Sequence, residues 1–193
     1  MYPLLKSSII DSFEVTKLIF DNSDLLEEVE NIIQEIISTL KNKNKILFFG
    51  NGGSAADSQH MSGEFVSKFM KDRKSLAAIA LTTDSSIITS ISNDFGYEYI
   101  FSRQIEGLGE KGDIAFAYST SGNSLNVING LKKAKKFGLK TIGFTGIDGG
   151  AIKKYCDLIV RIPSNSVPRI QEGHLLLGHI ICQVVEEEIT KNE

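Results

Sequence analysis

The sequence predicts an α/β protein with a doubly wound, five-stranded parallel sheet flanked by helices, preceded by two helices and followed by one long helix. From Lys45 onward, short apolar runs alternate with segments of helical periodicity, which is typical of strand–helix–strand units with right-handed crossovers. The runs are apolar throughout, as strands covered on both faces are. The length of 193 residues suits one domain at roughly 150 residues per domain.

The first 44 residues are expected to form a helical appendage to an α/β core over residues 45–193 of a single domain. Apolar residues recur at helical spacing from Leu4 to Leu18, and again from Leu25 to Leu40. Ser23 is the expected N-cap of the second helix. If this apolar stripe is exposed, its length favours contact between subunits.

The predicted strands are Ile46–Gly50, Leu76–Leu81, Asp113–Ser119, Lys140–Gly146 and Asp157–Ile162. The helices between them are predicted over Ala55–Phe69, Asp84–Ser92, Tyr99–Leu108 and Ser124–Phe137. The glycine-rich link after Thr145 has room for only a helical turn. Pro163 and Pro168 lead into the last helix, predicted from Arg169 to about Thr190, because proline is tolerated before and at the start of a helix.

Composition limits the classes of function. Lys and Arg number 21 and Asp and Glu 24, a net charge of −3, whereas nucleic-acid-coating proteins normally carry a basic surplus. No apolar run approaches the roughly 18 residues that span a bilayer, and the start lacks the regions of a signal peptide. Cys156 and Cys182 lack C-x-x-C spacing, and Cys182 is expected to be a buried, unreactive thiol. We expect a cytoplasmic protein with no nucleic-acid or membrane partner.

Two loops that follow predicted strands form the candidate ligand site, because open α/β sheets bind ligands outside the carboxyl ends of their strands. The first begins GNGGS (Gly50–Ser54), where glycines let the backbone approach a ligand closely. The second, STSGNS (Ser119–Ser124), has four hydroxyls at the predicted start of a helix. Hydroxyls, backbone N–H groups and the helix dipole all favour a phosphate there, whereas a capping loop needs only one hydroxyl.

The glycine loop also matches the loose G-x-G-x-x-[GA] fingerprint of dinucleotide-binding proteins, so a nicotinamide-dependent oxidoreductase is an alternative. The acidic residue expected at the end of the second strand is replaced by Leu81-Thr82-Thr83. No G-x-x-x-x-G-K-[ST] sequence is present, which disfavours a P-loop nucleotidase.

The histidines suggest a divalent-metal site. His60 and Glu64 are four residues apart on a predicted helix, so both lie on one face. Gln171 and His179 of the last helix could complete the ligand set, with zinc favoured by the imidazoles. These two residues stand roughly 12 Å apart along an ideal helix, so one donor could come from another protomer or a neighbouring segment. A buried core histidine is the alternative interpretation of His179.

The segments GNGGSAADSQHMSGEF, NDFGYEYIFSRQ, STSGNS, TGIDGG and RIQEGHLLLGH together resemble the phosphoheptose isomerases of the sugar-isomerase (SIS) domain family. The resemblance covers nearly the whole chain and implies an SIS-type fold. It implies a homotetramer with active sites at subunit interfaces. It also implies conversion of sedoheptulose 7-phosphate to D-glycero-D-manno-heptose 7-phosphate, the first step toward the heptose of bacterial lipopolysaccharide or capsule.

The resemblance also implies roles for the residues that match the family's motifs. The implied substrate contacts are Asn51, Gly52, Gly53, Glu64, Asn93, Asp94, Ser119, Thr120, Ser121, Ser124 and Gln171. The hydroxyl residues among them would bind the phosphate, and Asn93 and Asp94 would hold sugar hydroxyls. The family often has Asp just before RIQE, where this chain has Val167-Pro168, so no polar side chain is expected at that position.

Glu64 and His179 match the family's catalytic pair. Zinc, one ion per subunit, would take His60, Glu64, Gln171 and His179 as ligands. Ketose–aldose isomerisation moves a proton between C1 and C2 through an enediol, which requires one group at carbon and another at the oxygens. Either residue could remove the first proton, and Asp94 is a reserve candidate. Zinc would polarise the two sugar oxygens.

A non-catalytic SIS module is the main alternative. Such a protein would bind a sugar phosphate or a replication-initiator protein and act as a regulator. Non-catalytic relatives can lack the histidine of the last helix, so the full set of four candidate ligands, from His60 to His179, favours the enzyme.

Overall fold

All five strands of the sheet run parallel, in the order β2-β1-β3-β4-β5. The computed structural model describes residues 1–191 of the chain. Its strands are β1 (Ile46–Gly50), β2 (Ala78–Ala80), β3 (Ile114–Ser119), β4 (Lys140–Gly146) and β5 (Leu158–Ile162). This arrangement confirms the predicted fold class. The strand order reverses direction between β1 and β3, and this switch point is where such sheets bind ligands.

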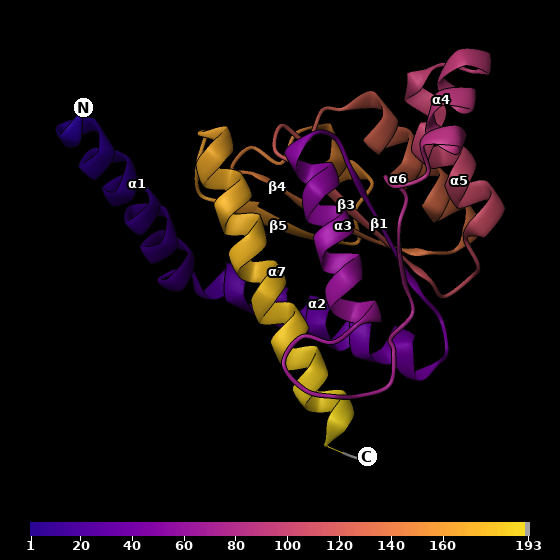
Figure 1. Ribbon diagram of the computed structural model, residues 1–193, viewed down its shortest axis with the longest axis horizontal. Helices are drawn as coiled ribbons and strands as arrows, with labels where there is room; N and C mark the ends of the chain where they lie inside the picture. The colour runs from indigo at the N-terminus through magenta and orange to yellow at the C-terminus, as the bar shows by residue number, and fades with distance from the viewer. Residues whose placement is uncertain (192–193) are drawn as a thin grey trace.

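The helices cover both faces of the sheet. They are α1 (Tyr2–Phe20), α2 (Ser23–Lys41), α3 (Gly53–Val66), α4 (Ser85–Asp94), α5 (Ile100–Leu108), α6 (Leu125–Phe137) and α7 (Val167–Thr190), with 3-10 turns η1 (Tyr97–Tyr99) and η2 (Ala151–Lys154). Phe48 and Phe116 pack beneath α2, α3 and α7, whereas their neighbours Phe49 and Ala117 pack beneath α5 and α6. Figure 1 shows α3 and α7 side by side, with α4, α5 and α6 grouped apart from them.

The first helix stands away from the sheet (Figure 1). Its apolar side chains are largely exposed, with Leu4 at 72% and Phe13 at 73%. By contrast, Ile32 and Ile36 of α2 are fully buried. Apart from Ile19 near its end, the apolar stripe of α1 is therefore largely uncovered by the described part of the chain, as a surface for subunit contact would be.

Two predicted elements, the glycine-loop helix and the strand after it, differ in extent from the prediction. The helix predicted to reach Phe69 ends at Val66, because the following residues cross over α7, where a carboxylate binds their backbone N–H groups. The strand predicted over Leu76–Leu81 spans only Ala78–Ala80, because both of its ends bond outside the sheet: Leu76 N donates to the carbonyl oxygen of Phe65 at 3.1 Å, and the carbonyl oxygen of Leu81 accepts from Gln104 at 2.9 Å.

The predicted N-cap of α2 was also wrong, since the N-cap is Asn22 and not Ser23. The side-chain oxygen of Asn22 accepts the N–H of Leu25 at 3.0 Å, while Ser23 already forms part of the helix.

At the β5 edge of the sheet, the Glu28 carboxylate accepts the N–H of Ile159 at 2.7 Å. This contact supplies a partner for a strand N–H that has no neighbouring strand on that side.

The thiol of Cys182 is buried, as predicted, and burial raises its pKa to about 12.

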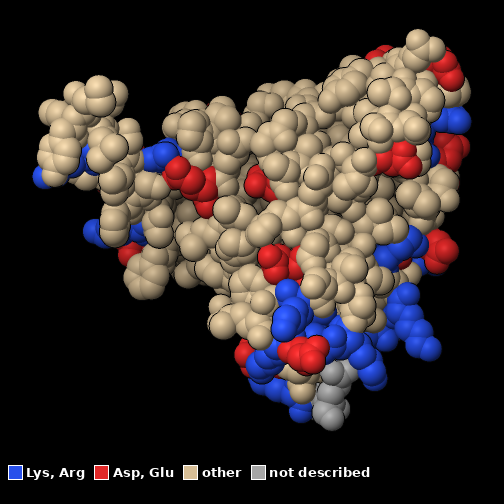
Figure 2. All heavy atoms as spheres, in the orientation of Figure 1, with Lys and Arg blue, Asp and Glu red and all other residues tan. Residues whose placement is uncertain are grey.

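Within residues 1–191 no helix has the length and apolar character needed to cross a bilayer. Figure 2 shows Lys and Arg side chains gathered around the end of α7, while most of the remaining surface on that face is uncharged.

Candidate active site

The glycine loop turns directly from β1 into α3 at the switch point. Gly52 has φ of +59°, in the left-handed region that favours glycine. At Gly53, an added Cβ would lie 2.2 Å from Nε2 of Gln171. The absence of a side chain therefore lets the Gln171 amide of α7 approach the start of α3. Gln171 and Gly53, two predicted site residues, lie against each other.

Asn51 joins the glycine loop to the opposite side of the switch point. Its amide exchanges two hydrogen bonds of 2.8 Å with the amide of Asn126, which is 3% exposed on α6. The Tyr97 hydroxyl donates to Asn51 Oδ1 at 3.0 Å. Asn126 and Tyr97 were not among the predicted site residues. Their sequence signal is position, because Asn126 closely follows the hydroxyl loop and Tyr97 follows the NDFG segment.

His60, Glu64 and His179 form a cluster in which one ligand atom from each lies within 4.8 Å of the others. Nε2 of His60 lies 2.8 Å from Nε2 of His179 and 3.5 Å from a carboxylate oxygen of Glu64. The first two ligands come from α3 and the third from α7. Two imidazole nitrogens this close need a proton or a cation between their lone pairs. The donor set of two imidazoles and a carboxylate suits zinc.

The distances also fit a zinc ion. Two nitrogens bound at about 2.0–2.1 Å in tetrahedral geometry lie roughly 3.3 Å apart, so a small rotation of one ring would open the observed 2.8 Å to that value. Gln171, the fourth predicted ligand, lies on α7 about two helical turns before His179 and contacts the glycine loop. The structure thus brings three of the four predicted ligands together.

The hydroxyl loop lies at the carboxyl end of β3 and opens α6, as predicted. Ser124 is the N-cap of α6, yet its side chain makes no capping hydrogen bond. Thr120 and Ser121 line a cavity of about 270 Å³ together with Gly146–Gly149. The loop is fixed by hydrogen bonds from Gly146 N to Thr120 O at 3.0 Å and from Ile152 N to Gly122 O at 2.9 Å. Hydroxyls that are not used for capping, on a fixed backbone at a helix start, can bind an anion.

Asn93 and Asp94 occupy the end of α4 and are exposed. The Asn93 amide donates to the Asp94 carboxylate at 2.8 Å. The η1 turn that follows brings Tyr97 to Asn51, so this segment borders the glycine loop. The contacts of Asn93 and Asp94 with sugar hydroxyls stay a prediction.

Asp57 is a further group that sequence reasoning missed. It lies one helical turn before His60, and one of its carboxylate oxygens is buried without a hydrogen-bond partner among the described residues. Burial raises the pKa of Asp57 to about 6, against the lowering effect of His60. Its spacing from His60 and Glu64 on one helix face is the signal that could have identified it.

His174, the remaining histidine, belongs to the core. It is fully buried, and its Nε2 lies 3.3 Å from the carbonyl oxygen of Thr145. Its ring packs against those of Tyr118 and Phe144, each at 5.6 Å. Burial lowers the pKa of His174 to about 4, so the imidazole is neutral at physiological pH.

Comparison with known proteins agrees with this fold and site. Residues 15–146 match the family model described as the SIS domain. The phosphoheptose isomerase of Clostridium acetobutylicum is 48% identical over 189 residues, covering 98% of this chain and 96% of that protein. Solved phosphoheptose isomerases from Neisseria gonorrhoeae and Francisella tularensis superimpose with TM-scores of 0.90 and 0.93, at 37% and 31% identity, each over 96% of this chain and 98% of the other.

Fold, site and comparisons define an SIS-domain enzyme of the phosphosugar isomerase class. Within that class, the chain belongs to the phosphoheptose isomerase family.

Proposed function

We propose that this chain interconverts sedoheptulose 7-phosphate and D-glycero-D-manno-heptose 7-phosphate, in the first step of heptose synthesis for lipopolysaccharide or capsule. The convergence of Glu64 and His179 beside the glycine loop carries this proposal, because it places a carboxylate and an imidazole from different helices in one cluster. Such a pair can move protons at adjacent carbon and oxygen atoms. The names of the full-length relatives support the substrate.

In the proposed reaction, the proton of one carbon of the C1–C2 unit passes to Glu64 and returns to the other carbon. His179 gives a proton to the carbonyl oxygen and takes one from the neighbouring hydroxyl, so that the intermediate is an enediol. Because Glu64 lies on α3 and His179 on α7, these roles require that the C1–C2 unit of the substrate lie between the two helices. Asn93 and Asp94 would hold the remaining hydroxyls from the end of α4.

The hydroxyl loop would bind the phosphate. Ser119, Thr120, Ser121 and Ser124 are the proposed phosphate ligands. Backbone N–H groups at the start of α6 would add to these contacts, and the helix dipole favours a dianion there. Asn51, Gly52 and Gly53 would position the sugar chain from the opposite side of the switch point, beside Gln171.

The same cluster would hold one zinc ion per subunit through His60, Glu64 and His179, with Gln171 as the fourth proposed ligand. Bound zinc supplies a Lewis acid that polarises the sugar oxygens. Glu64 and His179 would then serve as ligands and as proton carriers at different stages, which requires that the substrate displace at least one of them.

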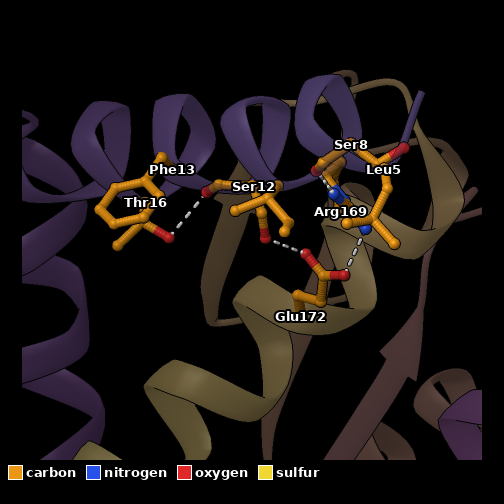
Figure 3. Close-up of a pocket in the computed structure, with 8 residues that line it drawn as sticks. Leu5, Ser8, Ser12, Phe13, Thr16, Arg169 and Glu172 are labelled. Carbon is orange, nitrogen blue, oxygen red and sulfur yellow. Dashed lines mark hydrogen bonds and ion pairs between the residues drawn. The ribbon is translucent and has the colours of Figure 1, made fainter. Parts of the chain in front are cut away.

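We propose that copies of the chain associate into a homotetramer with active sites at subunit interfaces. Figure 3 shows the groove between α1 and α7, with Arg169 paired to Glu172 and Ser12 donating to Glu172. The groove encloses about 670 Å³ and is lined by apolar side chains of α1, including Leu5, Ile9 and Phe13. Glu172 follows the candidate ligand Gln171 in the chain, so a second copy in this groove would border the site.

A zinc-loaded preparation should convert sedoheptulose 7-phosphate to the aldose. In deuterated water, the reaction should also exchange protons at C1 and C2, which NMR measures. Light scattering of the same preparation tests assembly, and Phe13→Glu should reduce the measured mass. No turnover by the pure, zinc-loaded protein would favour the non-catalytic alternative, a sugar-phosphate-binding or replication-initiator-binding regulator. A saturable change in fluorescence on titration with NADH would instead indicate a nicotinamide-dependent oxidoreductase.

A further inference from the structure

A buried carboxylate of α7 binds the segment that follows α3. Glu186, about two helical turns beyond His179, is 2% exposed. One of its oxygens accepts the N–H of Phe69 at 2.9 Å, and the other accepts those of Met70 at 2.7 Å and Lys71 at 2.8 Å. Successive backbone donors that surround one carboxylate form a nest for an anion. We call residues 67–75, which cross α7 here (Figure 1), the strap.

Arg73 of the strap completes the network from the side of α3. Its side chain is 2% exposed, and its Nε donates to Glu186 at 2.9 Å. Its two Nη atoms donate to the carbonyl oxygens of Glu64 and Phe65, each at 2.9 Å. These carbonyls belong to the last turn of α3, where backbone acceptors lack partners within the helix. One guanidinium therefore joins the end of α3 to a carboxylate of α7.

The strap also touches the candidate active site through Phe69. The ring of Phe69 lies 5.7 Å from the ring of His179, with an interplanar angle of 39°. The backbone N–H of the same residue is one of the groups that Glu186 binds. Both helices of the His60–Glu64–His179 cluster are therefore held at the strap, α3 through Arg73 and the imidazole of α7 through Phe69.

We propose that Arg73 and Glu186 are positioning residues of the active site. They fix the end of α3 against α7 and seat Phe69 on His179, so that His60, Glu64 and His179 keep the spacing that one metal ion requires. The inference rests on the proposed function, since it assigns the network to the same site. Some residues do not bind a metal but hold its ligands in place. Replacing such a residue typically lowers metal affinity or activity by about 10–100-fold.

The test compares Glu186→Gln with a matched control in the full-length protein. In Glu186→Gln, zinc affinity, measured by competition with a chromophoric chelator, should fall by about 10–100-fold. Under zinc saturation, kcat should fall by about tenfold or more while KM stays within about twofold, because the hydroxyl loop and the glycine loop, which supply most of the proposed substrate contacts, are untouched. Glu187→Gln is the control, because Glu187 is the next carboxylate on α7 and pairs with Lys71 at the surface. It should match the wild type in zinc affinity and in both kinetic constants.

Two further variants separate positioning from folding. Arg73→Lys keeps a charge but cannot reach both carbonyls and the carboxylate, so its zinc affinity should fall as in Glu186→Gln. Phe69→Leu keeps the ion pair and the strap, and it should lower zinc affinity less than Glu186→Gln does while its circular dichroism stays unchanged.

The outcomes are distinguishable. A Glu186→Gln protein that folds and matches the wild type in zinc affinity and kcat would overturn the positioning role alone. If Glu186→Gln does not fold, wild-type zinc affinity in Phe69→Leu would overturn it. A wild-type protein that neither binds zinc nor isomerises the sugar would overturn the proposed function together with the inference.

Discussion

The amides of Asn51 and Asn126 pair edge to edge through two hydrogen bonds of 2.8 Å, and this pair joins the glycine loop to α6, the helix that follows the hydroxyl loop. The two loops follow β1 and β3, the strands on either side of the switch point. The amide pair therefore helps to set the distance between the proposed sugar and phosphate contacts, in addition to the pairing of β1 with β3.

Replacement of Asn126 by Leu should disturb that distance. The change keeps the γ-branched shape of the side chain but removes its polar atoms, so the Asn51 amide loses both hydrogen bonds to residue 126, which should lower the free energy of unfolding by about 1–3 kcal/mol. KM for the sugar phosphate should rise, because both loops contact it. Urea denaturation and steady-state kinetics measure the two effects. Asn129→Ala, on the same helix but bound to the backbone of Glu98, is the control and should leave KM unchanged.

Glu64→Gln should abolish most of the turnover. The amide keeps the shape of the side chain but cannot accept a proton, so kcat should fall by about 100-fold or more. Binding of the substrate, measured by calorimetry, should persist. Turnover close to that of the wild type would remove Glu64 from the proton transfer.

The double change Ser119→Ala with Ser124→Ala should mainly raise KM, because phosphate binding is lost equally from the ground state and the transition state. Ser90→Ala on the exposed face of α4 serves as the control, since within residues 1–191 that hydroxyl binds a carbonyl oxygen of its own helix alone. An unchanged KM in the double variant would place the phosphate elsewhere.

His174 should make the protein sensitive to acid. Burial lowers the pKa of its imidazole from 6.5 to about 4, so between these values the unfolded chain binds a proton that the folded chain does not. The stability that neutral His174 contributes is complete above pH 6.5 and is lost as the pH falls toward 4. At about 1.4 kcal/mol per pH unit, the loss amounts to about 3 kcal/mol. His174→Gln should reduce the difference in unfolding free energy between pH 7 and pH 4 by that amount; an equal difference in both proteins would contradict the assignment.

In the metal-free protein, Asp57 should give stability the opposite dependence on pH, so that its contribution falls as the pH rises. Burial raises the pKa of its carboxyl from 3.8 to about 6, so the folded state favours the protonated acid. That preference stabilises the fold at low pH and is lost as the pH rises through 6. Asp57→Asn should therefore raise the free energy of unfolding at pH 7.5, by about 1–2 kcal/mol after allowance for solvent screening of a partly buried group, and not at pH 3.5. Equal changes at both pH values would exclude ionisation as the cause.

The sequence predicts the sheet well because its strands are covered on both faces, so apolar runs such as Ile46–Gly50 differ clearly from the helices around them. It predicts the cluster only in part. The i, i+4 spacing brings His60 to Glu64 on one helix, but the approach of His179 depends on how α7 packs against α3. The expected division of a single domain at residues 44 and 45 stays a prediction.

Sequence periodicity fails where a distant side chain decides the local structure. The residues up to Phe69 read as a continuation of α3, and their departure from it depends on Glu186, far away in the chain. Asn126 and Tyr97 were missed for a similar reason. Each is an ordinary polar residue in the sequence, and only the fold brings both into hydrogen-bond contact with Asn51. At the start of α2, Asn22 and Ser23 are adjacent and both are good caps, so composition alone could not choose between them.

The contact between Glu28 and the edge of β5 has a consequence for how copies of the chain meet. An open sheet edge invites strand addition from another molecule, and proteins prevent it by covering or shortening their outer strands. Here one outer strand has an N–H held by a carboxylate and the other is only three residues long. Intermolecular sheets are thereby disfavoured at both edges, so we expect the proposed tetramer to form through packing of helices.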